Sequence, residues 1–565
     1  MAQTTVAAPK ATSLSELPRR QVYLTLAGLL LAMLLSALDQ TVVGTAMPRV
    51  IAELRGFNHY AWVFTAYMVT STTMVPIFGK LSDIYGRKWF YLGGVALFLV
   101  ASWLCGLSQT MTQLILFRGL QGVGAGVMQA IAFTVVGDLF PPAERGKIQG
   151  VFSAVFGLAS IVGPTLGGWI TDNLNWRWVF YVNVPIGVLA LGTLFLFFPN
   201  IRPHGHERSI DYWGVLALIF GVVPMLIAFS WAGTEYPWGS SRIIGLLAFS
   251  AVMILGFIWL ETRAQEPVIP LSLFRNRTFT VSVISTFITS AGMFGAIMYI
   301  PLFVQGVIGT SATSSGTILM PMMFALIFSS IVSGQIISRT GKYKVITIVG
   351  LLVMTGGLYL LSRMDASATN ALVVRNMVIT GLGLGVTMPV FTMAVQNALP
   401  YKMLGVGTSS LQFFRAIGGT IGVAIYGSLL NNRFQDALQT NLPRQLTQIV
   451  PADRLKALDN PQVLVSPEAR QAMQRAFAQL GPQGEAILRQ LMESIKVSLS
   501  SAITGIFLVA AVAVLVSTVV TLFLPELPLR RSHQAAPVVE TGEFYYSDEE
   551  EDKERPKRSP SYEVS

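Results

Sequence analysis

Charged residues are scarce in this chain, and so are cysteine and histidine. Only 12% of the 565 residues are Asp, Glu, Lys or Arg, whereas 52% are hydrophobic and the mean hydropathy is +0.58. A water-soluble domain with this composition would expose a large apolar surface and would aggregate. The composition therefore excludes a soluble protein and indicates an integral membrane protein.

The rare residue types also exclude several kinds of chemistry. A single cysteine, Cys105, leaves no intramolecular disulfide and no cysteine metal cluster. The four histidines are scattered between apolar runs without metal-ligand spacing. The chain has no Gly-Lys-Ser/Thr phosphate loop, and the glycines of 122–126 belong to no strand–turn–helix unit. We therefore expect no enzyme, no metal, no cofactor and no ATP-driven cycle.

The formal net charge of +10 does not indicate a nucleic-acid partner, because the basic residues lie in short loops between apolar runs. Near the ends of these runs, about eighteen Lys and Arg lie in one alternate set of loops and about five in the other. Loops rich in Lys and Arg stay on the cytoplasmic side. Both termini belong to the rich set, so both are expected in the cytoplasm and the number of spans must be even.

The apolar runs provide about fourteen spans, at about 20 residues for each crossing. They predict an all-α integral membrane fold with two six-helix bundles and two additional central spans. The expected divisions are a cytoplasmic tail over residues 1–21, a bundle over 22–200, two linker spans over 201–277, a second bundle over 278–525, and a disordered cytoplasmic tail over 526–565. Residues 431–497 are expected on the outer side, as an amphipathic cap or a partly ordered loop.

Two similar polar turns suggest that the bundles are repeats. One reads Gly-Lys-Leu-Ser-Asp-Ile-Tyr-Gly-Arg-Lys at 79–88, and the other reads Gly-Gln-Ile-Ile-Ser-Arg-Thr-Gly-Lys-Tyr at 334–343. The spacing of Arg118, Gly124 and Gly126 also recurs in Arg375, Gly381 and Gly383. Parallel repeats related by an axis along the membrane normal are typical of secondary transporters.

The first turn has the chemistry of a conformational latch, built by Gly79, Asp83, Gly86, Arg87 and Lys88. Asp83 can accept hydrogen bonds from a helix N-terminus, while Arg87 and Lys88 can pair with acids across the interface between the halves. Such contacts would exist in one conformation and break in the other. Alternatively, Arg87 and Lys88 only fix the orientation of the protein.

Asp39 is the only acid well inside the first span, in its outer half. A carboxylate at that depth is costly unless it is paired, protonated or facing water, so Asp39 is a candidate for proton coupling. A structural hydrogen-bond acceptor near the helix end is the alternative. Arg118, near the outer start of the fourth span, could pair with a carboxylate or simply extend its head group to the interface.

Small residues at 157–168 indicate close packing and bending in the fifth span. The glycines permit tight helix contacts, and the proline frees a backbone carbonyl. We expect a flexing contact between the halves, formed by Gly157, Gly163, Pro164 and Gly167. Ordinary close packing is the alternative.

Several motifs in order resemble the major facilitator superfamily, over roughly residues 21–525. The turn at 79–88 resembles its loop between spans two and three. The stretches at 38–48, 116–126 and 157–168 resemble the first-, fourth- and fifth-span motifs of its drug:proton antiporters. Asn-Trp-Arg-Trp-Val-Phe-Tyr-Val-Asn-Val-Pro-Ile-Gly at 175–187, together with 409–419, resembles the fourteen-span branch.

The resemblance implies a function and a set of site residues. It implies a proton-relay role for Arg118 beside Asp39, and a substrate cavity lined by spans one, four, nine and twelve. The candidate lining residues combine adaptable apolar groups with amides. They are Gln121, Met128, Gln129, Phe133, Tyr299, Gln305, Met388, Phe391 and Gln396, with Arg415 deep in the thirteenth span.

The expected function is proton-coupled export of hydrophobic or cationic drugs across the cytoplasmic membrane by alternating access. The expected partners are a small amphipathic substrate, protons and the lipid bilayer, with the protein acting as a monomer. Export of a native lipid or apolar metabolite by the same cycle is one alternative. A non-transporting membrane sensor is another, although no folded output domain supports it.

Overall fold

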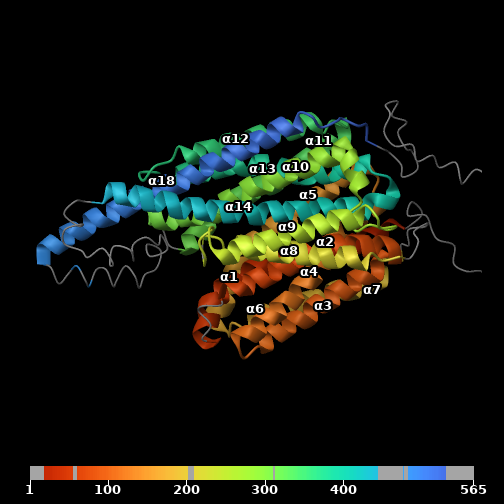
Figure 1. Cartoon of the computed structure of the whole chain (residues 1–565), viewed down its shortest axis with the longest axis horizontal. Coiled ribbons are helices and arrows are strands. Elements are labelled where there is room, and N and C mark those ends of the chain that lie inside the picture. The colour runs from red at the N-terminus through yellow and green to blue at the C-terminus, as the bar shows by residue number, and fades with distance from the viewer. Residues whose placement is uncertain are drawn as a thin grey trace, which may run out of the picture.

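The computed structural model describes residues 18–54, 60–200, 209–233, 235–309, 312–442, 475, 477 and 481–529. These residues form a bundle of long helices (Figure 1). The elements in chain order are α1 (Arg19–Leu54), α2 (Tyr60–Tyr85), α3 (Arg87–Leu107), α4 (Met111–Leu139), α5 (Pro142–Asn173), α6 (Trp178–Tyr181), α7 (Asn183–Phe197), α8 (Tyr212–Trp231), α9 (Ser241–Glu261), η3 (Leu271–Arg275), α10 (Arg277–Phe303), η4 (Val304–Ile308), α11 (Ala312–Thr340), α12 (Lys344–Ser362), α13 (Asn370–Ala398), η5 (Tyr401–Met403), α14 (Leu404–Asn441) and α18 (Gly481–Thr521).

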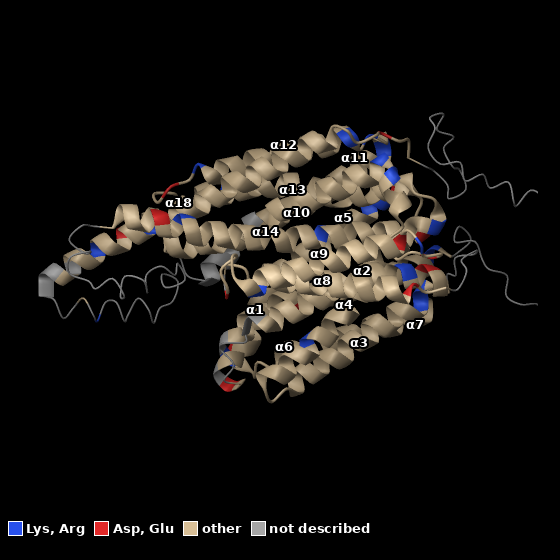
Figure 2. Ribbon diagram, in the orientation of Figure 1, with Lys and Arg blue, Asp and Glu red and all other residues tan. Residues whose placement is uncertain are grey.

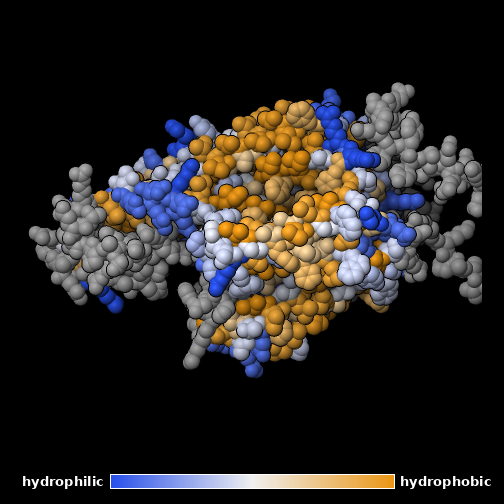
Figure 3. Space-filling view, viewed as in Figure 1, coloured by the Kyte–Doolittle hydropathy of each residue, from blue (hydrophilic) through white to orange (hydrophobic). Residues whose placement is uncertain are grey.

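Thirteen segments of the described chain are long and apolar enough to cross a membrane. The remaining long helix is α2, with 26 residues, whose Thr-Ser-Thr-Thr run at 70–73 makes it less apolar. With α2 the bundle has the predicted fourteen spans, and the predicted all-α membrane fold is confirmed. An apolar belt surrounds the middle of the visible face, while hydrophilic residues gather at its two ends (Figure 3).

Capping residues begin several of the spans. The side chains of Thr110, Asp211, Ser240, Asn276 and Thr369 each accept a hydrogen bond from a backbone N–H three residues later. These bonds satisfy amides that have no partner within the helix. The sequence therefore sets helix starts by local chemistry, and the apolar runs set the helix lengths.

One end of the bundle carries the turn between α2 and α3, and we call it the latch end. Lys88 and Gln21 both donate to carbonyls at the end of α7, so α1 begins there. Asn397 donates to the Pro528 carbonyl, so the last described residues lie there too. Charged side chains gather at this end, at the right of Figure 2. The opposite end is called the far end.

Buried side chains form two large cores. One core belongs to α10–α14 and α18, and the other mainly to α1–α5 and α7. The two linker helices, α8 and α9, contribute Leu218, Val222, Leu226 and Phe257 to the second core. The linker spans therefore pack against the N-terminal helices, beside α2.

The glycines correct the register of the repeat. A Cβ on Gly124 would meet Phe98 N and Gly94 O of α3, at 2.7 and 2.8 Å. A Cβ on Gly383 would meet Met354 N and Gly350 O of α12 in the same way, at 2.3 and 2.5 Å. Gly383 is thus the equivalent of Gly124, and Gly381 is not.

This register gives Arg118 no charged counterpart. The residue six positions before Gly383 is Met377, which is buried in the second half. Arg375 instead donates to the neighbouring Asn376 side chain, at 3.1 and 3.2 Å. The expected equivalence of Arg118 and Arg375 is wrong by half a helical turn, because equal spacing alone does not fix which face of a helix contacts its neighbour.

The last two helices extend past the other spans at the far end. With 38 and 41 residues, α14 and α18 are about 57 and about 62 Å long, about twice the hydrocarbon thickness of a bilayer. Their extensions pack together through Phe434, Leu438, Leu491 and Ile495. The predicted break near Gly481 is the start of α18, and most of 431–497 between the two helices lies outside the described residues.

Candidate functional site

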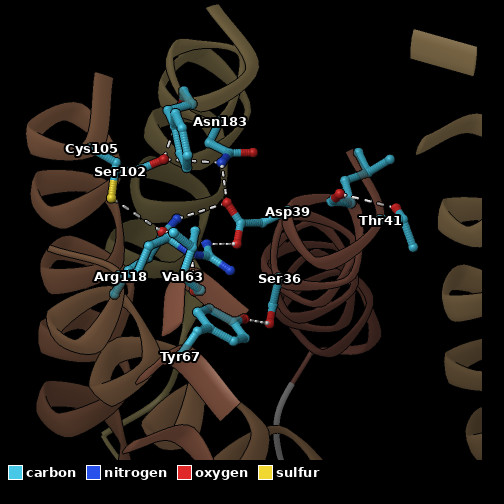
Figure 4. Close-up of polar contacts among 12 residues, drawn as sticks. Ser36, Asp39, Thr41, Val63, Tyr67, Ser102, Cys105, Arg118 and Asn183 are labelled. Carbon is cyan, nitrogen blue, oxygen red and sulfur yellow. Dashed lines mark hydrogen bonds and ion pairs between the residues drawn. The ribbon is translucent and has the colours of Figure 1, made fainter. Parts of the chain in front are cut away.

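A buried polar cluster lies within the N-terminal helices toward the far end (Figure 4). Asp39 of α1 is 0% exposed and Arg118 of α4 is 1% exposed. An Nη1 atom of Arg118 lies 2.5 Å from Asp39 Oδ2. The two charged residues that the sequence predicts as a proton site are therefore direct partners.

Three side chains donate to the Asp39 carboxylate. Arg118 bonds Oδ2, while Gln121 Nε2 and Asn183 Nδ2 bond Oδ1 at 2.9 and 3.0 Å. Asn183 also donates to Ser102 Oγ of α3 at 3.0 Å. Helices α1, α3, α4 and α7 thus converge on one carboxylate group.

Arg118 is held from several sides. Its Nη1 also donates to Gln121 Oε1 at 2.8 Å, and its Nε donates to the Val63 carbonyl at 3.3 Å. The guanidinium carbon lies 4.2 Å from the centre of the Tyr67 ring, a cation–π contact. The Tyr67 hydroxyl hydrogen-bonds Ser36 of α1. Arg118 is therefore fixed in place whether or not Asp39 carries a charge.

A break in the sixth span places Asn183. The ring of Pro185 cannot coexist with a helical carbonyl four residues earlier, and α6 ends at that residue, Tyr181. Asn183 then begins α7 and points toward Asp39. Sequence analysis quoted this residue only within a branch motif and assigned it no role.

The same motif anchors the far end. Arg177 and Trp176 both donate to the Glu53 carboxylate at the end of α1. The hydrogen bond from Arg177 and that from Trp176 lower the pKa of Glu53. The motif at 175–187 therefore holds α1 at two points, Glu53 and Asp39.

This arrangement can exchange a proton for an ion pair. Opposite charges stabilise each other in a medium of low dielectric constant, so Asp39 is stable as a carboxylate while Arg118 stays close. A proton on Asp39 would cancel that attraction and leave the arginine with its amide, carbonyl and aromatic contacts. The cluster thus has two charge states that favour different local geometries.

The latch residues form a second charged cluster. Arg87 lies 3.0 Å from Asp83 and 2.6 Å from Asp138 of α4, and all three side chains are buried. The other oxygen of Asp83 accepts the backbone N–H of Val406 at 2.9 Å, at the start of α14 in the second half. Asp83 thus contacts a helix N-terminus, as the sequence suggests.

The basic latch residues do not reach across the interface as expected. Both acids bonded to Arg87 belong to the first half. Lys88 donates to the Phe195 carbonyl of α7 at 2.9 Å. Lys80 pairs with Glu266 of the segment after α9. Asp83 alone among the latch side chains named here makes the crossing, with Arg87 holding it in position.

Glycines make the close approach at the latch possible. A Cβ on Gly79 would lie 2.1 Å from Ser409 Oγ, and one on Gly405 would lie 2.0 Å from Asp83 Oδ1. Gly86 has a φ of 98°, which allows the sharp turn into α3. The second half repeats the contact, with Gly334 against the Gly146 backbone.

Gln396, expected in the substrate cavity, lies instead at the latch end. Its amide nitrogen donates to the Phe133 carbonyl at 3.0 Å, and its backbone carbonyl accepts from Arg145 at 3.2 Å. Gln149 donates to its side-chain oxygen at 3.3 Å. These bonds join α4 and α5 to α13, so this end of the molecule is closed.

The fifth-span glycines face a different helix from the expected one. A Cβ on Gly163 would lie 1.9 Å from Thr41 Oγ1, and one on Gly167 would lie 2.2 Å from Thr45 Oγ1, both on α1 of the same half. Only Gly157 approaches the second half, at Ile327 of α11. Pro164 is exposed. The expected contact between the halves is therefore mainly a contact inside the first half.

The other cavity candidates divide by burial. Gln121 belongs to the Asp39 cluster, while Met128, Phe391 and Tyr299 lie in the apolar cores. The half-buried candidates are Phe133, Gln305, Met388 and Arg415, and Gln129 is exposed midway along α4. For the three core residues, helix packing is the observed role.

Comparison with known proteins agrees with this fold. The profile of the Major Facilitator Superfamily matches residues 29–423. Multidrug transporter protein MdtP of Bacillus subtilis (strain 168) is 42% identical, over 91% of this chain and 94% of that protein. Multidrug resistance protein 3 of the same organism is 37% identical, over 88% of this chain and 94% of that protein.

Solved structures show the same architecture at low identity. The human organic anion transporter MFSD10 superposes with a TM-score of 0.57 at 13% identity, over 88% of this chain and 100% of that one. The proton:xylose symporter XylE gives a TM-score of 0.54 at 11% identity, over 90% of this chain and 98% of that one. The chain is a multi-pass membrane transporter, not an enzyme, and it belongs to the major facilitator superfamily.

Proposed function

We propose that this chain is a proton-coupled antiporter that exports hydrophobic or cationic drugs across the cytoplasmic membrane. The observation that carries the proposal is the buried Asp39–Arg118 pair, with two further donors on the carboxylate. A carboxylate so far from water is costly, and a proton-coupled cycle gives it a use. The two Bacillus subtilis relatives, both named for multidrug transport or resistance, support drugs as the substrate class.

The proposed cycle uses the two clusters in turn. The bias of Lys and Arg in the loops makes the latch end cytoplasmic, together with both termini. With the latch closed, a proton arriving from outside neutralises Asp39 and releases it from Arg118. The latch then opens to the cytoplasm, where substrate enters and the proton leaves. Substrate binding returns the protein to the latch-closed state.

The test uses inside-out vesicles with an acid interior and a pH-sensitive dye. A panel of lipophilic cations and neutral drugs is added to vesicles with the native protein, with Asp39→Asn, or with Asp172→Asn. Asp172 is an exposed carboxylate at the far end and serves as the matched control.

We expect several compounds to collapse the gradient with the native protein and with Asp172→Asn, and at least about tenfold more slowly with Asp39→Asn, because a charged hydrogen bond contributes about 1.5–3 kcal/mol. If no compound collapses the gradient, drug antiport is contradicted, and export of a native lipid or apolar metabolite becomes the next candidate. If Asp39→Asn responds like the native protein, Asp39 is not the coupling acid.

A further inference from the structure

Arg415 is a cation in the middle of α14 with no carboxylate beside it. Its Nη1 donates to Gln412 Oε1 at 2.9 Å, and its Nη2 donates to the Met388 carbonyl of α13 at 3.2 Å. No described carboxylate lies within 4.0 Å of its guanidinium, whereas Arg118 and Arg87 each have acid partners. Of these arginines within spans, Arg415 alone keeps its charge uncompensated in the described residues.

Gln412 adds a second donor with no acceptor. The residue is 1% exposed, and its Nε2 has no hydrogen-bond partner in the described structure. The carbonyl of the same amide group is bonded to Arg415, so the free N–H group lies next to the guanidinium. Buried donors without acceptors are costly, and most find a partner.

The position of α14 puts this pair of donors between the two halves. Figure 1 shows α14 between α10 on one side and α2 and α8 on the other, and contacts with all three helices agree. Phe413 and Ile417, on either side of Arg415 in the sequence, pack into the core of the N-terminal helices. A substrate carried by alternating access must pass between the halves, so it can reach α14.

An oxygen with negative charge would satisfy both donors together. A guanidinium binds a carboxylate through parallel hydrogen bonds, and an amide N–H can complete the set. A substrate with only cationic groups would add repulsion at this place.

Building on the proposed function, we propose that Arg415 and Gln412 form a subsite for the carboxylate of an amphipathic substrate. The transported compounds then include zwitterions and acids, besides cations that bind elsewhere in the cavity. The ligand itself supplies the acid that the described chain lacks at Arg415.

The test compares two dyes that differ in one carboxylate. Rhodamine 110 has a free carboxylate, and rhodamine 123 is its methyl ester. Transport of each dye is measured in inside-out vesicles with the native protein, Arg415→Gln, Arg415→Lys, Gln412→Met and Arg375→Gln. Arg375 is the matched control, since it is an arginine of the same half that bonds its neighbour Asn376.

We expect Arg415→Gln to lower the ratio of rhodamine 110 to rhodamine 123 transport at least about tenfold. Gln412→Met should lower it less, Arg415→Lys should keep part of it, and Arg375→Gln should leave it unchanged. Equilibrium binding of rhodamine 110 to the purified variants, followed by fluorescence polarisation beside their thermal unfolding, separates lost recognition from lost folding.

Three outcomes would overturn the subsite. The first is equal loss of both dyes in Arg415→Gln, which is a structural effect. The second is an unchanged ratio. The third is native protein that moves rhodamine 123 but not rhodamine 110, which leaves the proposed exporter standing. Native protein that moves neither dye nor any compound of the drug panel removes the proposed function and this subsite with it.

Discussion

Asp39 is the residue on which the proposed coupling depends, and its neighbours set how it behaves. Arg118 supplies the compensating charge, and Gln121 and Asn183 supply neutral donors. Because all three donors bind the ionised form better than the neutral form, removing any one of them makes protonation easier. The amides are therefore positioning groups that act on transport through Asp39.

Asn183 offers the cleaner test of this idea, since it does not contact Arg118 in the described bonds. We expect Asn183→Leu to slow transport about fivefold to tenfold and to move the pH dependence of transport toward higher pH, because a hydrogen bond to a charged group contributes about 1.5–3 kcal/mol and part of that loss is recovered by rearrangement. Transport rates across a pH series in vesicles check both effects.

Asn173→Leu is the control, because Asn173 is exposed and bonds only its own helix, at the Trp169 carbonyl. A slower rate with an unchanged pH profile in Asn183→Leu would mean that Asn183 only supports the fold.

Sequence alone could find the charged partners but not the amides. A charge inside an apolar span is rare, so Asp39 and Arg118 stand out as candidates without any coordinates. An asparagine or glutamine does not stand out in the same way, and Gln121 was assigned to the substrate cavity although it bonds Asp39. The break before Asn183 follows from Pro185 and was a usable signal.

Among the helices, α5 is the one that holds α1, and with it Asp39, in place. Gly163 and Gly167 let the α1 backbone and its threonines approach closely. The Thr41 hydroxyl, which touches Gly163, also donates to the Ala159 carbonyl of α5 at 3.1 Å. The motif therefore works as a fixed contact beside the proton site.

Adding one methyl group to this contact should disturb it. A Cβ on Gly163 would lie 1.9 Å from Thr41 Oγ1, whereas a Cβ on Gly168 would have nothing within 4 Å. We expect Gly163→Ala to lower the free energy of unfolding by about 1–3 kcal/mol and to slow transport. Gly168→Ala should change neither, as measured by thermal unfolding in detergent and by transport. Equal effects of the two substitutions would contradict this role for Gly163.

Helix faces are the part of the fold that sequence patterns described least well. Lengths and caps follow from local chemistry, so the spans and their order could be predicted. The face that each glycine turns to a neighbour depends on packing between distant segments. This is why the fifth-span glycines were expected between the halves, and why Arg375 was paired with Arg118 in place of Met377.

In the molecule as a whole, the two halves meet most closely at the latch end. Asp83 reaches the start of α14, Gln396 reaches α4 and α5, and Gly146 touches Gly334. The described structure is therefore the latch-closed state. In that same state Asp39 is paired with Arg118, so the proposed cycle links a deprotonated Asp39 to a closed latch.

The measurement that tests this link most directly is the distance across the latch end as a function of pH. Spin labels go on Lys147→Cys of α5 and Lys402→Cys of η5, two exposed lysines from different halves, in a Cys105→Ser background. The distance distribution is recorded from pH 8 down to pH 5, with and without Asp39→Asn.

We predict that acid lengthens the distance in the protein that retains Asp39, because protonation releases the closed state. With Asp39→Asn the distance should be long at every pH, since this side chain imitates the protonated acid. If Asp39→Asn gives the same pH dependence as the protein that retains Asp39, the latch responds to other acids, such as Asp83 and Asp138, and the proposed coupling through Asp39 is contradicted.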